Sequence, residues 1–224
     1  MKAPIPINET ARIAALRRYH LLDTAPEQAF DDIVKLASYI CGTPIAIVSL
    51  VDTERQWFKS KVGVDATETH RDHAFCAHAI LQKSIFVVND ALTDERFANS
   101  ELVINDPHIR FYAGAPLTTL EGLSLGALCV VDRRPNSLTL EQENALMALS
   151  RLTVNEMELR RISADLATAV TEIKTLNGLL PVCAWCKKIR NDDGCWEQLE
   201  SYIQNNTNTD FSHGICPDCI KKEF

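Results

Sequence analysis

The sequence predicts an α+β chain in which an antiparallel sheet flanked by helices is followed by a long helix and a small zinc-binding module of the treble-clef or ribbon type. Three observations predict this organisation. Helical and strand-like hydrophobic patterns alternate up to about residue 138, an apolar seven-residue repeat follows, and two C-x2-C pairs stand near the end of the chain. We therefore expect three parts, at residues 1–138, 139–180 and 181–224.

The composition is that of an ordinary soluble globular protein, because 46% of its 224 residues are hydrophobic and 24% are charged. The net charge of −7 gives no general attraction to phosphate backbones or anionic membranes, so we expect neither nucleic acid nor a membrane as partner. No apolar run approaches the roughly 20 residues that span a bilayer, and the N-terminus lacks the apolar stretch of a secretory signal. These features predict a cytoplasmic protein.

The first part opens with two helical patterns, within residues 11–16 and 30–40, and Pro26 precedes the second. A stretch between residues 88 and 111 that is rich in Asp, Asn and Pro predicts an irregular crossover lying over the sheet. Together the patterns read helix, helix, hairpin, crossover, hairpin, helix, which describes an α+β domain with an antiparallel sheet. Apolar, β-branched runs predict the strands, at residues 44–51, 56–60, 85–88, 111–117 and 125–131.

Several short segments of this first part carry a family resemblance. They include LLDTAPE (residues 21–27), FDDI (30–33), VSLVD (48–52), RQWFKS (55–60), FCAHAI (75–80), DERF (94–97), RFYAGAPL (110–117) and LGALCVVD (125–132). They resemble the GAF domains that precede histidine kinases and diguanylate cyclases in bacterial signalling proteins, and the resemblance covers about residues 8–160. It implies a sensory and dimerising module without catalysis of its own, whose ligand lies between the sheet and the crossover. It does not predict which ligand is bound.

The candidate residues for a small-molecule pocket come from the segments that resemble the family. Cys76 is expected to be a small buried side chain on a helix. The charged members either contact the ligand or pin the crossover over the sheet. The full set of candidates is Phe75, Cys76, His78, Asp94, Arg96, Arg110 and Tyr112.

A cluster of His70, His73, Cys76 and His78 has the chemistry of metal ligands. It leaves open a haem, a second metal, or a bilin attached through Cys76. The phytochrome pattern places a histidine directly after the cysteine, whereas Ala77 stands there in this chain. The simplest expectation is that these residues serve the structure of the domain.

The second part carries a heptad repeat. Two interpretations fit: the helix packs against its own domain, or two chains pair as a parallel coiled coil, giving a homodimer through residues 139–180. In the second case Asn155 would fix the register at some cost in stability. The positions seven apart are Leu152, Leu159, Leu166, Ile173 and Leu180, and those between them are Asn155, Ile162, Ala169 and Leu176.

The tail carries the strongest chemical signal. Cys183 and Cys186 form one C-x2-C pair, and Cys216 and Cys219 form another, which together supply the four soft donors of a tetrahedral zinc site. A tail of roughly 44 residues has little core, so a structural zinc would contribute much of its folding free energy. An iron–sulfur cluster on the same thiolates and a metal-free thiol switch remain open.

Two further residues bear on the tail site. His213 could replace one sulfur ligand, whereas the neighbours of Cys195 favour a turn. The tail resembles a cysteine module appended to bacterial GAF, PAS and receiver proteins, which carry an aromatic residue where this chain has Cys195. Cys195 is therefore not expected to be a ligand.

Signatures of catalysis are absent from the sequence, which has no phosphate-binding glycine loop, no nucleophile elbow and no kinase or cyclase motif. We expect no catalytic residues. Methionine-sulfoxide reductases with a GAF fold use clustered cysteines, whereas Cys41, Cys76 and Cys129 are far apart in this sequence, although the fold could bring them together. The sequence thus predicts a signal-sensing adaptor whose pocket acts through a dimeric helix on a zinc module that docks a signalling protein. The alternatives are a thiol redox sensor or reductase using the C-x2-C pairs, or a haem or iron–sulfur sensor.

Overall fold

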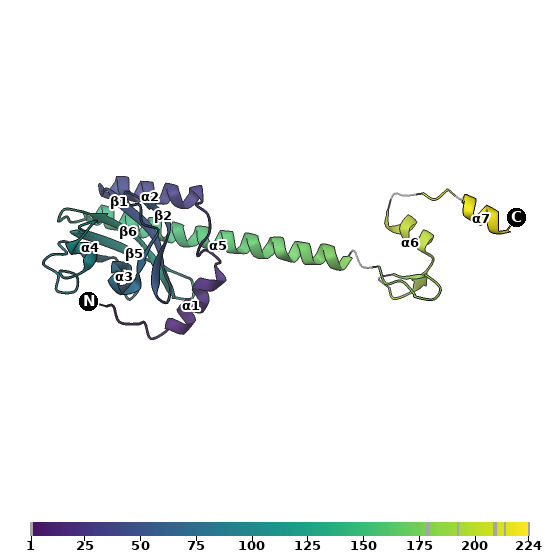
Figure 1. Cartoon of the computed structure of the whole chain (residues 1–224), viewed down its shortest axis with the longest axis horizontal. Coiled ribbons are helices and arrows are strands. Elements are labelled where there is room, and N and C mark those ends of the chain that lie inside the picture. Colours follow the sequence, from purple (N-terminus) through teal and green to yellow (C-terminus); the bar gives the residue numbers. More distant parts are fainter. Residues whose placement is uncertain (1, 178–179, 192, 208–209, 213, 224) are drawn as a thin grey trace. The chain divides into compact units, whose positions relative to one another are not determined.

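The computed structural model describes residues 2–177, 180–191, 193–207, 210–212 and 214–223 (Figure 1). The chain divides into two compact units, Met1–Asp165 and Leu166–Phe224. No helix within the described ranges combines the length and the apolar character needed to cross a bilayer.

The first unit is built on a six-stranded antiparallel sheet with the strand order β3-β2-β1-β6-β5-β4. This sheet confirms the predicted α+β class and the two predicted hairpins. The edge strand β3 was not predicted, because three residues are too few to show an alternating pattern. The strands are β1 (Ile45–Val51), β2 (Arg55–Val62), β3 (Glu68–His70), β4 (Phe86–Val88), β5 (Phe111–Thr118) and β6 (Ser124–Asp132).

Both faces of the sheet are covered, which explains why β1 reads as one continuous apolar run. Ala46, Val48 and Leu50 pack with α1 (Glu9–Arg18), α2 (Gln28–Cys41) and the first turns of α5 (Leu140–Asn177). Ile45 and Ile47 face the other core. That core includes α3 (Phe75–Ala79), which follows the 3-10 turn η1 (Arg71–His73), and the crossover with its short helix α4 (Glu101–Ile104). The ribbon in Figure 1 shows the helices around the sheet.

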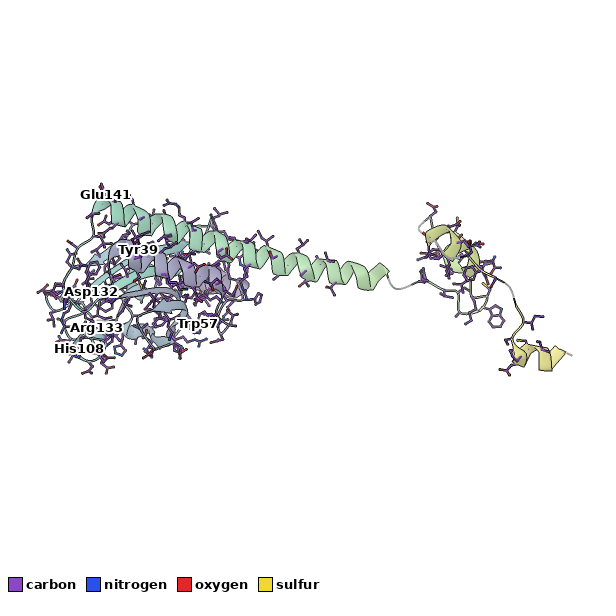
Figure 2. All side chains as sticks on the ribbon, turned by 90° about the horizontal axis from the view of Figure 1, so that it is seen from above. Tyr39, Trp57, His108, Asp132, Arg133 and Glu141 are labelled. Carbon is purple, nitrogen blue, oxygen red and sulfur yellow. The ribbon has the colours of Figure 1, made fainter. Side chains whose placement is uncertain are left out.

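Helix α5 begins with a reciprocal capping box. The Thr139 backbone N–H donates to Gln142 Oε1 at 2.9 Å, and the Gln142 N–H donates back to Thr139 Oγ1 at 3.3 Å. Glu141 lies in the first turn, and Figure 2 labels it at the start of the helix.

Helix α5 carries apolar side chains on two separate faces. Leu146, Leu149 and Met157 are buried against the domain's own helix-side core. The predicted heptad positions lie on another face, where Leu159 is 59% and Leu166 is 63% exposed. Packing on its own domain therefore does not use the heptad stripe, and the coiled-coil prediction stays a prediction. The side chains of Ile173 and Leu176 lie outside the described residues.

The second unit contains a hairpin of β7 (Ile189–Arg190) and β8 (Trp196–Glu197), then α6 (Leu199–Asn206) and α7 (Pro217–Glu223). Its turn has Gly194 at φ +82°, and the Asn191 N–H donates to the Cys195 carbonyl at 2.9 Å. Among the described residues of this unit, Ile189 alone is buried. The unit thus has almost no hydrophobic core, as its length led us to expect.

Candidate functional site

A cavity of about 90 Å³ lies on the face of the sheet that α3 covers. Its walls are almost entirely apolar and come from β1, β2, β6, α3 and the crossover, with Ile47, Phe58 and Val131 among them. A space of this size holds a few water molecules or a very small ligand, since drug-sized ligands occupy roughly 300–1,000 Å³.

Two residues of the cavity lining, Gln56 and Thr69, each carry a buried polar side-chain atom. Gln56 on β2 and Thr69 on β3 are directly opposite each other across the two strands. Within the described part of the chain, Gln56 Oε1 and Thr69 Oγ1 have no hydrogen-bond partner. Buried polar groups ordinarily have partners, because leaving one unsatisfied costs roughly 1–3 kcal/mol. A ligand that hydrogen-bonds to these atoms would remove that cost.

Sequence reasoning missed both of these residues. A signal was present for Gln56, because it lies two positions before the buried Phe58 and therefore on the same face of β2. A polar side chain at an inward-facing strand position indicates a candidate binding site. Thr69 gave no such signal, because β3 itself was not predicted.

Replacing Thr69 with valine tests whether the hydroxyl is unsatisfied in solution. Valine has nearly the same shape, so we expect the free energy of unfolding to stay the same or rise by up to about 1 kcal/mol in urea titrations. Thr153→Val is the matched control, because the Thr153 hydroxyl is fully buried and donates to the Leu149 carbonyl at 2.8 Å. The control should lose about 1 kcal/mol. A comparable loss in Thr69→Val would contradict the assignment.

Three of the predicted pocket residues, Phe75, Cys76 and Tyr112, line the cavity. The Tyr112 hydroxyl donates to Cys76 Sγ at 3.1 Å. Cys129 on β6 also lines the cavity, and its Sγ lies 3.7 Å from that of Cys76. The fold thus joins two cysteines that are distant in the sequence, while Cys41 lies on α2 in the opposite core.

The other four predicted pocket residues lie outside this lining. His78 packs on the Phe86 and Phe97 rings, with ring centroids 6.0 and 4.9 Å away. The Arg96 guanidinium lies 4.8 Å from the Phe86 ring centroid and pairs with Asp94 at 2.5 Å. These residues hold the crossover together. Arg110 has the same effect, because it donates to the Val103 and Ile109 carbonyls.

The histidines near Cys76 do not assemble into a metal site. The rings of His70 and His73 are 5.9 Å apart, and His70 Nδ1 accepts the backbone N–H of Asp72. Throughout the described ranges, no three His, Cys, Asp or Glu side chains converge on a point that could hold a metal ion.

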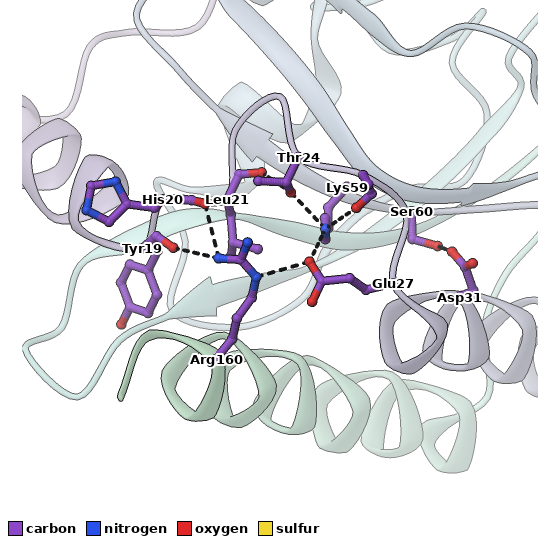
Figure 3. A network of polar contacts seen from close by, with 10 residues as sticks. Tyr19, His20, Leu21, Thr24, Glu27, Asp31, Lys59, Ser60 and Arg160 are labelled. Carbon is purple, nitrogen blue, oxygen red and sulfur yellow. Dashed lines mark hydrogen bonds and ion pairs between the residues drawn. The ribbon is translucent and has the colours of Figure 1, made fainter. Parts of the chain in front are cut away.

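A polar network joins the sheet to α5 (Figure 3). The β1–β2 register shifts opposite Lys59, and the Lys59 side chain is only 1% exposed. Its ammonium group donates to Thr24 Oγ1 at 2.8 Å, the Ala25 carbonyl at 2.7 Å and Glu27 Oε1 at 2.6 Å. Arg160 on α5 donates to the same Glu27 oxygen at 3.0 Å. One carboxylate oxygen therefore links β2 to α5.

The two neighbouring cations, Lys59 and Arg160, keep the Glu27 carboxylate ionised. Burial by itself would raise the pKa of Glu27, but the hydrogen bonds and charges of Lys59 and Arg160 outweigh it and lower the pKa. Arg160 also donates to the carbonyls of Tyr19 and His20, so α5 is held where the chain leaves α1. A displacement of β2 at Lys59 would act directly on α5.

In the tail, the two cysteines of each C-x2-C pair lie close together. The backbone N–H groups of Cys186 and Trp185 lower the pKa of the Cys183 thiol, and those of Cys219 and Asp218 lower the pKa of the Cys216 thiol. Cys216 directly precedes α7. The described residues do not gather all four sulfurs at one point. His213 lies outside the described residues.

Residues 25–157, more than half of the chain, match the family model described as the GAF domain. The chain belongs to the GAF domain family. This membership confirms that the first part is a GAF domain. The cavity lies where GAF domains were expected to bind ligands, between the sheet and the crossover.

A sequence relative of this chain is named as a cyclic di-GMP phosphodiesterase of Pseudomonas aeruginosa. It is 44% identical over 144 residues, which make up 64% of this chain and 24% of the relative. The chain thus spans about a quarter of that protein's length. The phosphodiesterase activity in that name belongs to the whole relative.

Two solved structures show the same fold. The GAF domain of a phosphoenolpyruvate-protein phosphotransferase from Coxiella burnetii has a TM-score of 0.53 at 13% identity, covering 70% of this chain and 98% of that one. A bacteriophytochrome of the photosynthetic bacterium R. palustris has a TM-score of 0.55 at 10% identity, covering 78% and 42%. At these identities the likeness extends to the fold alone.

Proposed function

We propose that this GAF protein is a non-catalytic signal sensor and adaptor. The state of its cavity acts through a paired α5 on a zinc-containing tail that docks a signalling protein. The observation that carries this proposal is the Glu27 carboxylate, shared by Lys59 of β2 and Arg160 of α5. It supplies a physical route from a sheet that lines the cavity to the helix that leaves the domain.

The cavity suggests the class of signal. Its small volume and apolar walls favour a compact, mostly apolar molecule that satisfies Gln56 Oε1 and Thr69 Oγ1. A cyclic dinucleotide is far larger than the cavity, so we do not extend the relative's named substrate to this pocket.

The exposed heptad stripe favours a second copy of the chain as the partner of α5. The stripe repeats a leucine every seven residues, at Leu152, Leu159 and Leu166. These side chains are 54%, 59% and 63% exposed, respectively. Covering them against the same stripe of another chain would bury apolar surface at every second turn of a coiled coil. Asn155, also exposed, would set the register.

The donor chemistry of the tail fits zinc. Cys183, Cys186, Cys216 and Cys219 would hold the ion, which would supply structural cross-linking rather than chemistry. Lys187 has a left-handed φ of +61° directly after Cys186, and its N–H donates to the Cys183 carbonyl, so the first pair lies on a tight turn. Backbone N–H groups aimed at sulfur stabilise thiolates, the form that binds metal.

The tail's surface favours a protein as its partner. Trp185 is 95% exposed and Ile215 is also exposed, which suits docking to an apolar patch. A net charge of −7 argues against nucleic acid and anionic membranes. The cytoplasm, where thiols stay reduced, suits such a metal site.

Native mass spectrometry of protein purified without added metal tests the proposal as a whole. We expect a particle of two chains with one zinc each, and a small retained ligand whose mass disappears when the protein is denatured. A zinc-free monomer would contradict both the coupling helix and the zinc module. Brown, iron-rich protein would instead favour the iron–sulfur alternative.

A further inference from the structure

We propose that Cys76 and Cys129 form a redox-active dithiol, which closes to a disulfide when a small hydroperoxide enters the cavity. This site lies in the GAF core and is separate from the C-x2-C pairs of the tail. It does not depend on the proposed function, because the reaction needs only the geometry of the first unit.

The first argument is the distance between the sulfurs. Cys76 lies on α3 and Cys129 on β6, and their Sγ atoms are 3.7 Å apart, in contact. A disulfide requires about 2.05 Å. Helix α3 packs directly on β6, so a small shift of this five-residue helix closes the gap.

The second argument is access. Both cysteines are only 1% exposed, yet both line the cavity. The lining continues to Ala66, an exposed residue between β2 and β3. Hydrogen peroxide is close to water in size, and the cavity of about 90 Å³ holds more than one water molecule. The oxidant can therefore reach thiols that bulkier reagents cannot.

The third argument is the environment of Cys76. Tyr112 donates to its sulfur at 3.1 Å, and it can do so because Gly114 leaves room: a Cβ at position 114 would lie 2.2 Å from the Tyr112 hydroxyl oxygen. Burial would raise the pKa of the Cys76 thiol, but its polar contacts with Cys129, Ser49 and Tyr112 lower it.

The partner thiol differs. The hydrogen bond with Cys76, together with burial, raises the pKa of Cys129 well above its ordinary value. We assign Cys76 as the nucleophile, because the Tyr112 hydroxyl donates to its sulfur and stabilises the reactive thiolate, and Cys129 as the resolving thiol.

The chemical steps balance. The Cys76 sulfur attacks one oxygen of the hydroperoxide, the O–O bond breaks, and the other oxygen leaves as water or an alcohol with the thiol proton, which gives a sulfenic acid. The Cys129 sulfur then attacks the sulfenic sulfur, the S–O bond breaks, and the hydroxyl leaves as water with the Cys129 proton. Two thiols lose two electrons in total, and the hydroperoxide gains them. A dithiol reductant reverses the reaction by exchange.

Tryptic peptide mapping of the unaltered full-length protein tests the proposal. Trypsin releases Cys76 in residues 72–83 and Cys129 in residues 111–133, and neither peptide contains another cysteine. After hydrogen peroxide and alkylation in denaturant, we expect these two peptides joined, with a mass about 2 Da below their sum. Dithiothreitol added before the alkylation should restore both free peptides.

Two variants sharpen the result. In Cys129→Ser the cross-link should vanish, and dimedone should capture a sulfenic acid on Cys76. Cys41→Ser is the matched control, because Cys41 is another buried cysteine of the same unit, in the opposite core, and the cross-link should remain. The proposal fails if both peptides stay fully alkylated while the exposed tail cysteines are oxidised, or if Cys76 is joined to any cysteine other than Cys129.

Discussion

Replacing Cys216 with serine is expected to remove the zinc from the purified chain and to unfold the tail while the GAF unit stays folded. Metal binding in small zinc modules contributes roughly 10–16 kcal/mol at neutral pH, and most of their folding depends on it. In the described part of the tail only Ile189 is buried, so little else holds this unit together. We expect zinc to fall from one per chain to nearly none.

The measurements separate the two units. Zinc is counted by elemental analysis, and the fate of α6 and α7 is followed by circular dichroism and by protease sensitivity of the tail. Trp57 is buried in the GAF core, so a core-specific unfolding transition should be unchanged. Trp185 is already 95% exposed and is a poor reporter of the tail.

Cys195→Ser is the matched control for the zinc prediction. Cys195 is exposed and takes part in the hairpin turn, where its N–H donates to the Asn191 side chain at 2.9 Å. This bond comes from the backbone, so serine should keep both the turn and the zinc. Loss of zinc from this variant would revise the donor set. Four freely titrating thiols in metal-free wild-type protein would reject the site.

Replacing Leu159 and Leu166 with lysine is expected to convert a dimer into a monomer. Each dimer would lose four leucines from its seam and gain four charges there. Burial of a leucine is worth roughly 1.5–3 kcal/mol, so the dissociation constant should rise by at least about a thousandfold. Light scattering across a dilution series, or analytical ultracentrifugation, measures the change.

A matched control adds the same two lysines to the same helix away from the seam. Ala164 and Ala167 are exposed on α5 outside the heptad positions, so Ala164→Lys with Ala167→Lys should leave the dimer intact. Lysine and alanine both favour helices, so the helix itself is preserved. If the leucine variant stays dimeric, the interface lies elsewhere, and α2 becomes the candidate because it exposes Leu36 and Tyr39. Figure 2 labels Tyr39.

The local patterns of the sequence determined the elements of this protein. The apolar run of β1 and the hairpin of β5 and β6 could be predicted from residue type and spacing, because strand and helix periodicities are encoded within a few residues. The capping signal at Thr139 and the turn ending at Gly194 are equally local. The same patterns predicted the order of the elements, and the family resemblance added the general place of the pocket.

The tertiary structure decided what these elements bring together. The contact of Cys76 with Cys129 and the pairing of Gln56 with Thr69 join positions far apart in sequence or on strands too short to predict. Lys59 binds Glu27 through a register shift that changes where one side chain points, which no periodic pattern encodes. Local sequence sets backbone propensity, whereas cavities and shared carboxylates arise from the packing of distant segments. The cavity's polar atoms and the link to α5 could therefore be found only in the folded chain.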